Sequence, residues 1–455
     1  MLVSTAPGSG GGALAQVDEA RLSGAHWRWT ILSALGDYLD AGSIVAGGAS
    51  VLLWTQLYHL DSSTVGLIAA VGSNGFSTAV GALIGGRLGD FYGRKFIYSI
   101  DLLIYALGAV VVMLSASLPL LIAGLVVMGL AVGADIPTSW SLIAEFSPRR
   151  ERGKMMGFTN IFWYIGPIVI LLLSLAFSHL GITGVRLVFG SLLLVAVVTW
   201  FLRRRLAESP RWALARGKTA EVESAAQQLG FHAEAAAPAA VPAVAPWREM
   251  FRNGGWRRLA FITPIYVLWG IPAGTYGFFL PYIFKTEGAT TAAGGDLLEI
   301  LWFASAIVAV LVIFMPFNDR VDRRILYAIS AAFCAAAFYL LVAFPITDPT
   351  VAILNVLLFG FGQGIGLWPL QRVWSVELFP TSVRNTAQGS LWAVMRIMIG
   401  GWSLFLPVLA GASGFKLVAV IMGLMFTYNL VVGGLFGPRT GGQSLEAIQS
   451  GSLAT

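Results

Sequence analysis

The feature that most constrains this chain is a series of twelve apolar runs, each long enough to cross a lipid bilayer. A membrane-spanning helix needs roughly 17–25 predominantly apolar residues. Only 11% of the 455 residues are charged, against about 25% in a typical soluble domain. We therefore expect an all-α membrane protein with twelve transmembrane helices, at residues 30–54, 64–86, 97–116, 119–143, 155–178, 184–202, 258–284, 297–317, 325–344, 351–375, 387–409 and 413–435.

Basic residues are concentrated in alternate loops. One set of loops is rich in Lys and Arg, including the long stretch between residues 203 and 258, whereas the other set holds only Arg186, Lys285 and Lys416. Loops rich in Lys and Arg stay in the cytoplasm. The pattern predicts a multi-pass protein of the bacterial inner membrane with both termini in the cytoplasm.

The longest polar stretch divides the chain in the middle. It covers residues 203–256 and contains an Ala/Pro-rich run at 233–246 that is typical of a linker. We expect a cytoplasmic tail at 1–29, a six-helix bundle at 30–202, the cytoplasmic linker at 203–256, a second six-helix bundle at 257–435 and a cytoplasmic tail at 436–455.

Two motifs of the first half recur in the second. Residues 145–157 (EFSPRRERGKMMG) match residues 377–389 (ELFPTSVRNTAQG) at Glu, Pro, Arg and Gly, and residues 90–95 (DFYGRK) match residues 319–324 (DRVDRR). Motifs that recur in the same order indicate a parallel repeat about an axis along the membrane normal. The sequence therefore predicts two pseudo-symmetric halves.

The charged residues of these motifs are candidates for a gate. Acids at helix ends that face Arg side chains can form charge-assisted hydrogen bonds, and acids contribute little to membrane orientation. The alternative is that the charges only set the topology. We favour a cytoplasmic latch between the halves, formed by Asp90, Arg94, Glu145, Arg152, Asp319, Arg323, Glu377 and Arg384.

These motifs resemble those of the major facilitator superfamily. Residues 86–95 (GRLGDFYGRK) resemble its signature loop between helices two and three, and residues 208–212 (ESPRW) resemble the sugar porter branch, as do 145–153 and 377–384. The resemblance covers nearly the whole chain. It implies a central cavity between the halves, alternating access and, in bacteria, commonly proton symport.

The chain also departs from the sugar porter pattern. It has no Gln-Gln pair in helix seven and no Arg in helix four, where residues 133–139 (GADIPTS) resemble phosphate and organic-anion porters instead. The spacing of Asp37 and Asp40 points the same way, but helix seven lacks the acid of phosphate porters. The whole pattern most resembles bacterial inositol-type transporters. A sugar or polyol such as inositol is the expected solute, and an organic anion or phosphate is the alternative.

Asp37, Asp40 and Asp135 fall within apolar spans and are candidates for proton coupling. An ionisable group in the hydrocarbon costs roughly 2.5–3.5 kcal/mol, so Asp37, Asp40 and Asp135 are expected to face a cavity. Asp37 and Asp40, three residues apart, share one helix face. We hypothesise that Asp40 and Asp135 carry the proton and that Asp37 assists. The alternative is that they lie near helix ends and are solvated.

Solute contacts call for hydrogen-bonding groups and an aromatic platform. The resemblance implies that Asn160 replaces a sugar-contacting Gln and that Trp368 is a sugar-stacking Trp, although membrane tryptophans are often interface anchors. Arg396 could pair with an anion, which keeps the organic-anion alternative open. The candidates for solute binding are Asn160, Tyr266, Trp269, Tyr276, Gln363, Trp368, Gln371, Gln388 and Trp392.

Other classes of function find no support in the sequence. The four histidines have no metal-ligand spacing, no P-loop is present, and no catalytic nucleophile is recognisable. We therefore expect no enzyme, cofactor, metal or nucleic-acid partner. The expected partners are a small solute, protons and the lipid bilayer, for a chain that acts as a monomer. A transporter-like sensor is less favoured, because the polar C-terminal tail is short.

Overall fold

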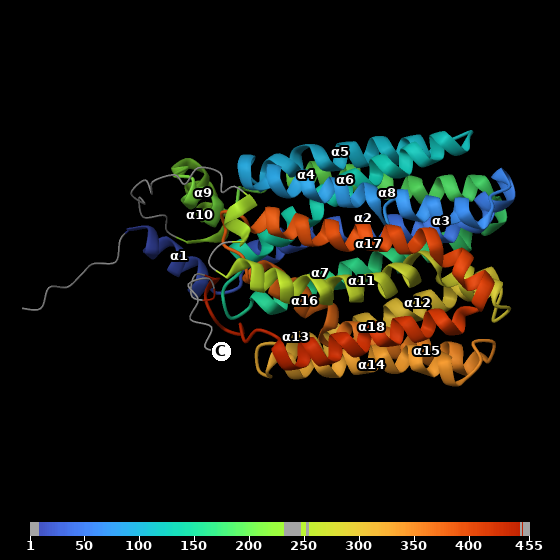
Figure 1. The fold of residues 1–455 in the computed structure, drawn as a ribbon. Coiled ribbons are helices and arrows are strands. Elements are labelled where there is room, and N and C mark those ends of the chain that lie inside the picture. The colour runs from blue at the N-terminus through green and yellow to red at the C-terminus, as the bar shows by residue number, and fades with distance from the viewer. Residues whose placement is uncertain (1–8, 232–246, 252–253, 446–447, 449–455) are drawn as a thin grey trace, which may run out of the picture.

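The computed structural model describes residues 9–231, 247–251, 254–445 and 448, and all regular elements among them are helices. The long helices run side by side along one axis (Figure 1). The first half comprises α2 (Gly24–Tyr58), α3 (Ser62–Val71), α4 (Phe76–Tyr92), α5 (Arg94–Met113), α6 (Leu118–Phe146), α7 (Arg152–Phe177) and α8 (Ile182–Arg203).

The second half begins with α11 (Gly255–Thr286). It continues with α12 (Ala292–Ala309), which runs through a π-helical turn (Val310–Phe314) into α13 (Met315–Phe317), and with α14 (Arg323–Ala343). The last helices are α15 (Pro349–Gly362), a second π-helical turn (Gln363–Leu367), α16 (Trp368–Glu377), α17 (Arg384–Ser413) and α18 (Phe415–Phe436).

The predicted membrane helices are confirmed. Within the described residues, eleven helices are long and apolar enough to cross a membrane, counting α3 with α4, α12 with α13, and α15 with α16 as single spans. The twelfth is α2, a 35-residue helix that packs against α6, α7 and α8. Its apolar stretch is diluted by glycines and by Asp37 and Asp40. The chain is thus a twelve-helix membrane protein in two halves.

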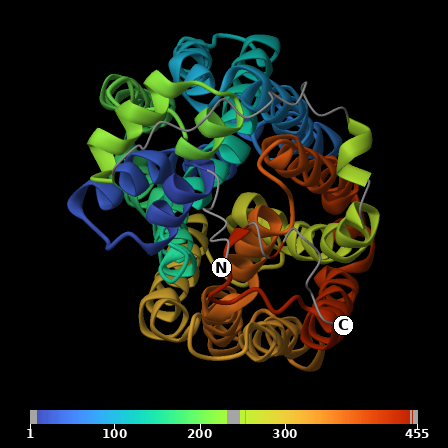
Figure 2. The same cartoon turned by 90° about the vertical axis from the view of Figure 1, so that its left-hand side faces the viewer.

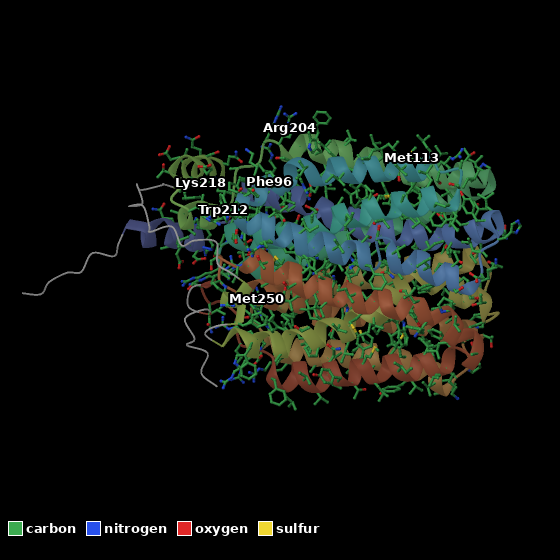
Figure 3. All side chains as sticks on the ribbon, turned by 45° about the horizontal axis from the view of Figure 1, so that its top comes forward. Phe96, Met113, Arg204, Trp212, Lys218 and Met250 are labelled. Carbon is green, nitrogen blue, oxygen red and sulfur yellow. The ribbon has the colours of Figure 1, made fainter. Side chains whose placement is uncertain are left out.

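One end of the bundle, here named the basic end, carries the short helices α1 (Ser9–Glu19), α9 (Pro210–Ala215) and α10 (Thr219–Leu229). Figure 2 shows these helices lying over the first half. In Figure 3, Trp212, Lys218 and Met250 lie at this end, whereas Met113 lies toward the other end. The predicted linker begins at Arg203, which the structure makes the last residue of α8.

The break between α15 and α16 is stabilised by a neighbouring helix. Gly366 departs from helical geometry, with φ 179° and ψ −21°. The Leu367 N–H donates to Ser330 Oγ of α14 at 2.7 Å, and that hydroxyl donates to the Gly362 carbonyl. Freed backbone groups must find such partners inside a membrane. The break places Gln363 and Trp368 close to the interface between the halves.

Candidate functional site: a cavity and ion pairs between the halves

A narrow cavity of about 20 Å³, enough for about one water molecule, lies between the two halves. Helices of both halves form its wall, α2 and α7 from the first and α11, α12 and α17 from the second. Much of the wall is apolar or aromatic, with a single charged group. The side chains that characterise it are Ala41, Trp163, Trp269, Phe303, Trp392 and Arg396.

Aromatic rings form a platform beside this cavity. The Trp269 and Trp368 rings stack with centroids 3.8 Å apart and planes 9° apart, and Trp392 stacks on Trp368 at 5.8 Å. Tyr266 packs on Trp368 at 5.8 Å. Trp140, which the sequence analysis did not select, approaches Trp392 edge-on at 5.1 Å. The platform therefore draws on helices of both halves.

Several buried donors at the platform have no hydrogen-bond partner among the described residues. They are the indole Nε1 atoms of Trp368 and Trp392 and the Nε2 atom of Gln363. The Gln363 Oε1 atom accepts from Trp269 Nε1 at 2.6 Å, which fixes the orientation of the amide. Buried polar groups normally find partners, so these donors are suited to the oxygens of a bound solute.

Asp37 forms an ion pair that crosses between the halves. Arg372 of α16 donates to both carboxylate oxygens, at 3.0 and 2.8 Å, and also to Asn160 Oδ1 at 2.6 Å. Trp140 Nε1 donates to Asp37 at 3.0 Å, and the Arg372 guanidinium lies 4.0 Å from the Trp140 ring centroid. The Asp37 and Arg372 side chains are fully buried. Such a pair holds the halves together through both charge and geometry.

Asp40 forms a second pair of the same kind, one turn along α2. Arg396 of α17 donates to its two oxygens at 3.0 Å each, and Trp163 Nε1 of α7 donates at 3.2 Å. The Arg396 guanidinium also lies 4.5 Å from the Trp392 ring centroid. Asp40 and Arg396 are buried, and Arg396 lines the cavity. The anion expected to pair with Arg396 is thus supplied by the protein itself.

Asp135 lies elsewhere than the sequence analysis expected. Arg203 donates to its two oxygens at 2.6 and 3.2 Å and lies 3.6 Å from Asp101. All three residues belong to the first half. The Asp135 carboxylate therefore pairs with Arg203 inside that half and does not line the central cavity. Arg203 was assigned to the linker because it opens a run of three arginines. Asp101, which lies in the predicted span 97–116, was not among the selected acids.

Three of the expected solute-contacting residues are engaged in other ways. Asn160 accepts from Arg372, as described above. Gln371 donates to the Ile265 carbonyl at 2.9 Å and to the Tyr327 hydroxyl at 2.8 Å. Tyr276 donates to Asn355 at 2.9 Å within an aromatic core of the second half. Gln388 is buried, and its Nε2 atom has no partner among the described residues. Sequence spacing could not give the rotation of these helices about their axes.

The eight residues expected to form a latch meet at the basic end. Glu145 accepts from Arg94 at 2.7 Å and from Arg384 of the other half at 2.9 Å. Asp90 lies 3.3 Å from Arg94 and accepts from the backbone of Asn385 and Thr386 at 3.2 and 2.7 Å. These contacts join α4 and α6 to the start of α17.

The ion-pair cluster around Glu377, which corresponds to that around Glu145 in the sequence repeat, is built the same way. Glu377 lies 3.5 Å from Arg152 of the first half and 2.9 Å from Arg323, which also lies 3.2 Å from Asp319. Asp18 of α1, which the sequence analysis did not select, lies 3.4 Å from Arg152. The basic end is therefore closed by two clusters of ion pairs, each with one pair that crosses between the halves.

Residue Glu208 ties the segment after α8 to the latch. Its carboxylate accepts from the backbone N–H groups of Arg94 and Lys95 at 3.0 and 3.1 Å. Burial raises the pKa of the Glu208 carboxyl. Ser209, the next residue, donates to Glu145 at 2.5 Å. The 208–212 motif thus has a structural role around Glu145.

Comparison with known proteins agrees with this architecture. A family described as sugar (and other) transporters matches residues 39–451. The minor myo-inositol transporter IolF of Bacillus subtilis is 37% identical over 420 residues, which cover 92% of each chain. The proton myo-inositol cotransporter of Homo sapiens is 33% identical over 202 residues, covering 44% of this chain and 30% of that protein.

The fold has solved counterparts as well. The proton:xylose symporter XylE bound to 6-bromo-6-deoxy-D-glucose superposes with a TM-score of 0.77 at 20% identity, over 93% of this chain and 98% of that one. The family match and the Bacillus relative each span most of the sequence. The chain is therefore a membrane transport protein and not an enzyme: it belongs to the family of sugar (and other) transporters and has the fold of the major facilitator superfamily.

Proposed function

We propose that this protein is a proton-coupled symporter that takes up a neutral polyol or sugar, with inositol as the first candidate. It would act as a monomer in a bacterial inner membrane, with the basic end in the cytoplasm in accordance with the positive-inside rule. The observation that carries the proposal is the pair of buried ion pairs, Asp37–Arg372 and Asp40–Arg396, that join the halves beside an aromatic cavity.

These ion pairs suggest how protonation would be coupled to movement. A proton on Asp37 or Asp40 removes the charge that holds the guanidinium of the opposite half. The attraction between the halves then falls, and the halves can separate on one side of the cavity. A charge that moves through 100 mV yields about 2.3 kcal/mol. This free energy can sustain a solute concentration ratio of more than tenfold, because each factor of ten costs about 1.4 kcal/mol.

The charges around the cavity favour a neutral solute. Each central guanidinium already has a carboxylate partner, so an anion would have to displace Asp40 from Arg396. The unpartnered indole and amide donors instead suit hydroxyl oxygens of the solute. The stacked indole rings offer a surface for the apolar face of a polyol or sugar ring. The relatives named for myo-inositol support the same solute class.

The test of this function is counterflow in proteoliposomes. Labelled myo-inositol is expected to exchange across the membrane, and an inward proton gradient is expected to drive its accumulation. Unlabelled polyols should compete. An organic-anion porter remains the second candidate because Arg396 lines the cavity. Competition by carboxylates but not by polyols would favour that reading over ours.

Substitution of Gln363 tests the solute site directly. Gln363→Leu is expected to raise KM for the solute about 2–12-fold, because one net hydrogen bond is worth about 0.5–1.5 kcal/mol. The measurement is the concentration dependence of uptake. Gln227→Leu, on the exposed face of α10, is the matched control. Equal KM values for both variants would show that Gln363 does not contact the solute.

A further inference from the structure

Helix α12 carries two acids, Asp296 and Glu299, that the ion pairs described above do not use. Glu299 is 1% exposed, and its Oε1 atom has no hydrogen-bond partner among the described residues. Both acids lie within an apolar span. An ionised carboxylate without a counter-charge is costly in such a place, which favours the protonated, neutral form of Glu299.

Glu299 lies on the inner side of its helix. Leu297 and Val308 mark the lipid-facing side, with 57% and 51% of their surface exposed. A rotation of 100° per residue puts Glu299 nearly opposite these two side chains. It falls between Asp296 and Phe303, one turn from each. The acid therefore points into the protein.

Asp296 and Phe303 each line a different hollow. Phe303 belongs to the wall of the central cavity. Asp296 lines a second hollow of about 320 Å³, away from the basic end, together with Ser50, Gln56 and Lys285. Along α12 the order is thus the second hollow, Asp296, Glu299, Phe303 and the central cavity. Glu299 is the titratable group between the two spaces.

The charged groups around Glu299 are few. Helix α12 packs against α7, α11 and α15. The charged residues of α7, Arg152 and Lys154, lie at the basic end, and α15 has none within its bounds. α11 brings Lys285 to the hollow that Asp296 lines. Asp296 is the charged neighbour of Glu299, and repulsion between two acids favours a single bound proton.

We propose that Glu299 is a proton-binding site, loaded from the second hollow through Asp296, and that it supplies the proton to the central ion pairs. This assignment rests on the proposed proton symport. On that orientation the second hollow opens toward the outside of the cell. Glu299 accepts a proton from the water outside by way of Asp296. Glu299 becomes ionised again when that proton moves on toward the central cavity.

The experiment compares Glu299→Gln with the wild-type protein in proteoliposomes. Glutamine mimics the loaded, neutral acid. Accumulation driven by a proton gradient is expected to fall at least tenfold, solute-driven proton uptake is expected to vanish, and counterflow is expected to persist without its dependence on outside pH. Glu287→Gln, an acid in the loop after α11, is the control and should behave as wild type.

Two outcomes separate this assignment from the proposed function. Wild-type protein that moves solute without protons would sink the symport proposal itself. Proton uptake that survives in Glu299→Gln, or a folded Glu299→Gln without counterflow, would overturn the assignment while symport stands. Asp296→Asn provides an independent check, since it should shift the pH dependence of uptake, and a wild-type profile in that variant would also overturn the assignment.

Discussion

Asp37→Asn is expected to abolish proton-driven accumulation of solute and to lower the stability of the protein by about 3–5 kcal/mol. The large effect arises because the substitution leaves Arg372 buried without a carboxylate. Removing one partner of a buried pair costs about this much, since the remaining charge stays desolvated. Both side chains are completely buried in the structure. Uptake assays with a proton gradient and thermal unfolding of purified protein measure the two effects.

The double variant Asp37→Asn with Arg372→Gln separates charge from coupling. It is expected to recover much of the lost stability, because no buried charge is then left unpaired, but to stay inactive in accumulation. Glu151→Gln is the matched control: it breaks the half-exposed Glu151–Lys154 pair at 3.6 Å and should change stability by less than about 1 kcal/mol. Full accumulation in the double variant would refute the role of Asp37 in coupling.

The fold could be predicted from the sequence because the bilayer imposes it. Spans of apolar residues, basic loops on one side and two repeated motifs leave little freedom in topology. The latch residues could also be found, since a repeat that carries both acids and arginines has a simple geometric explanation. Among the spans α2 gives the weakest signal, as its glycines and acids reduce the hydropathy that identifies the other helices.

The pairing of the central charges could not be predicted in this way. Asp37 and Arg372 are 335 residues apart and belong to different halves, so no local pattern joins them. Asp135 shows the converse error. It resembles a cavity acid in sequence, but Arg203 reaches back from the end of α8 and neutralises it within the first half. Which partner an acid finds depends on the packing of helices about their axes.

The platform residues illustrate the same limit. Of the residues expected to bind solute, Trp269 and Trp392 line the central cavity and Trp368 stacks on both, but Tyr276 and Gln371 point into the second half instead. The π-helical turn and the break at Gly366 shift the register of side chains between α15 and α16. A period of 3.6 residues carried through that break would assign faces wrongly.

Glu145→Gln is expected to open the basic end of the carrier. Glu145 accepts from Arg94 in its own half and from Arg384 in the other, with all three side chains fully buried. The neutral amide removes one carboxylate from the two guanidinium groups and leaves Asp90 and Glu208, both beside Arg94, as the remaining acids. A loss of about 3–5 kcal/mol from the closed form raises the ratio of open to closed molecules by more than about 100-fold.

Cysteine labelling can measure this shift, because Cys334 is the sole cysteine of the chain. In a Cys334→Ser background, Ser141→Cys places a thiol one helical turn from Glu145 on the same face of α6, at a position that is buried in the closed form. A membrane-impermeant maleimide applied from the basic side should label it at least tenfold faster when Glu145 is replaced, and no faster when the half-exposed Glu151 is replaced. Turnover should fall at the same time, since the carrier must close this end in every cycle and the substitution weakens only the closed state. Labelling that stays slow in the Glu145→Gln protein would mean that the apolar contacts between α4 and α17 hold the end shut without the ion pairs.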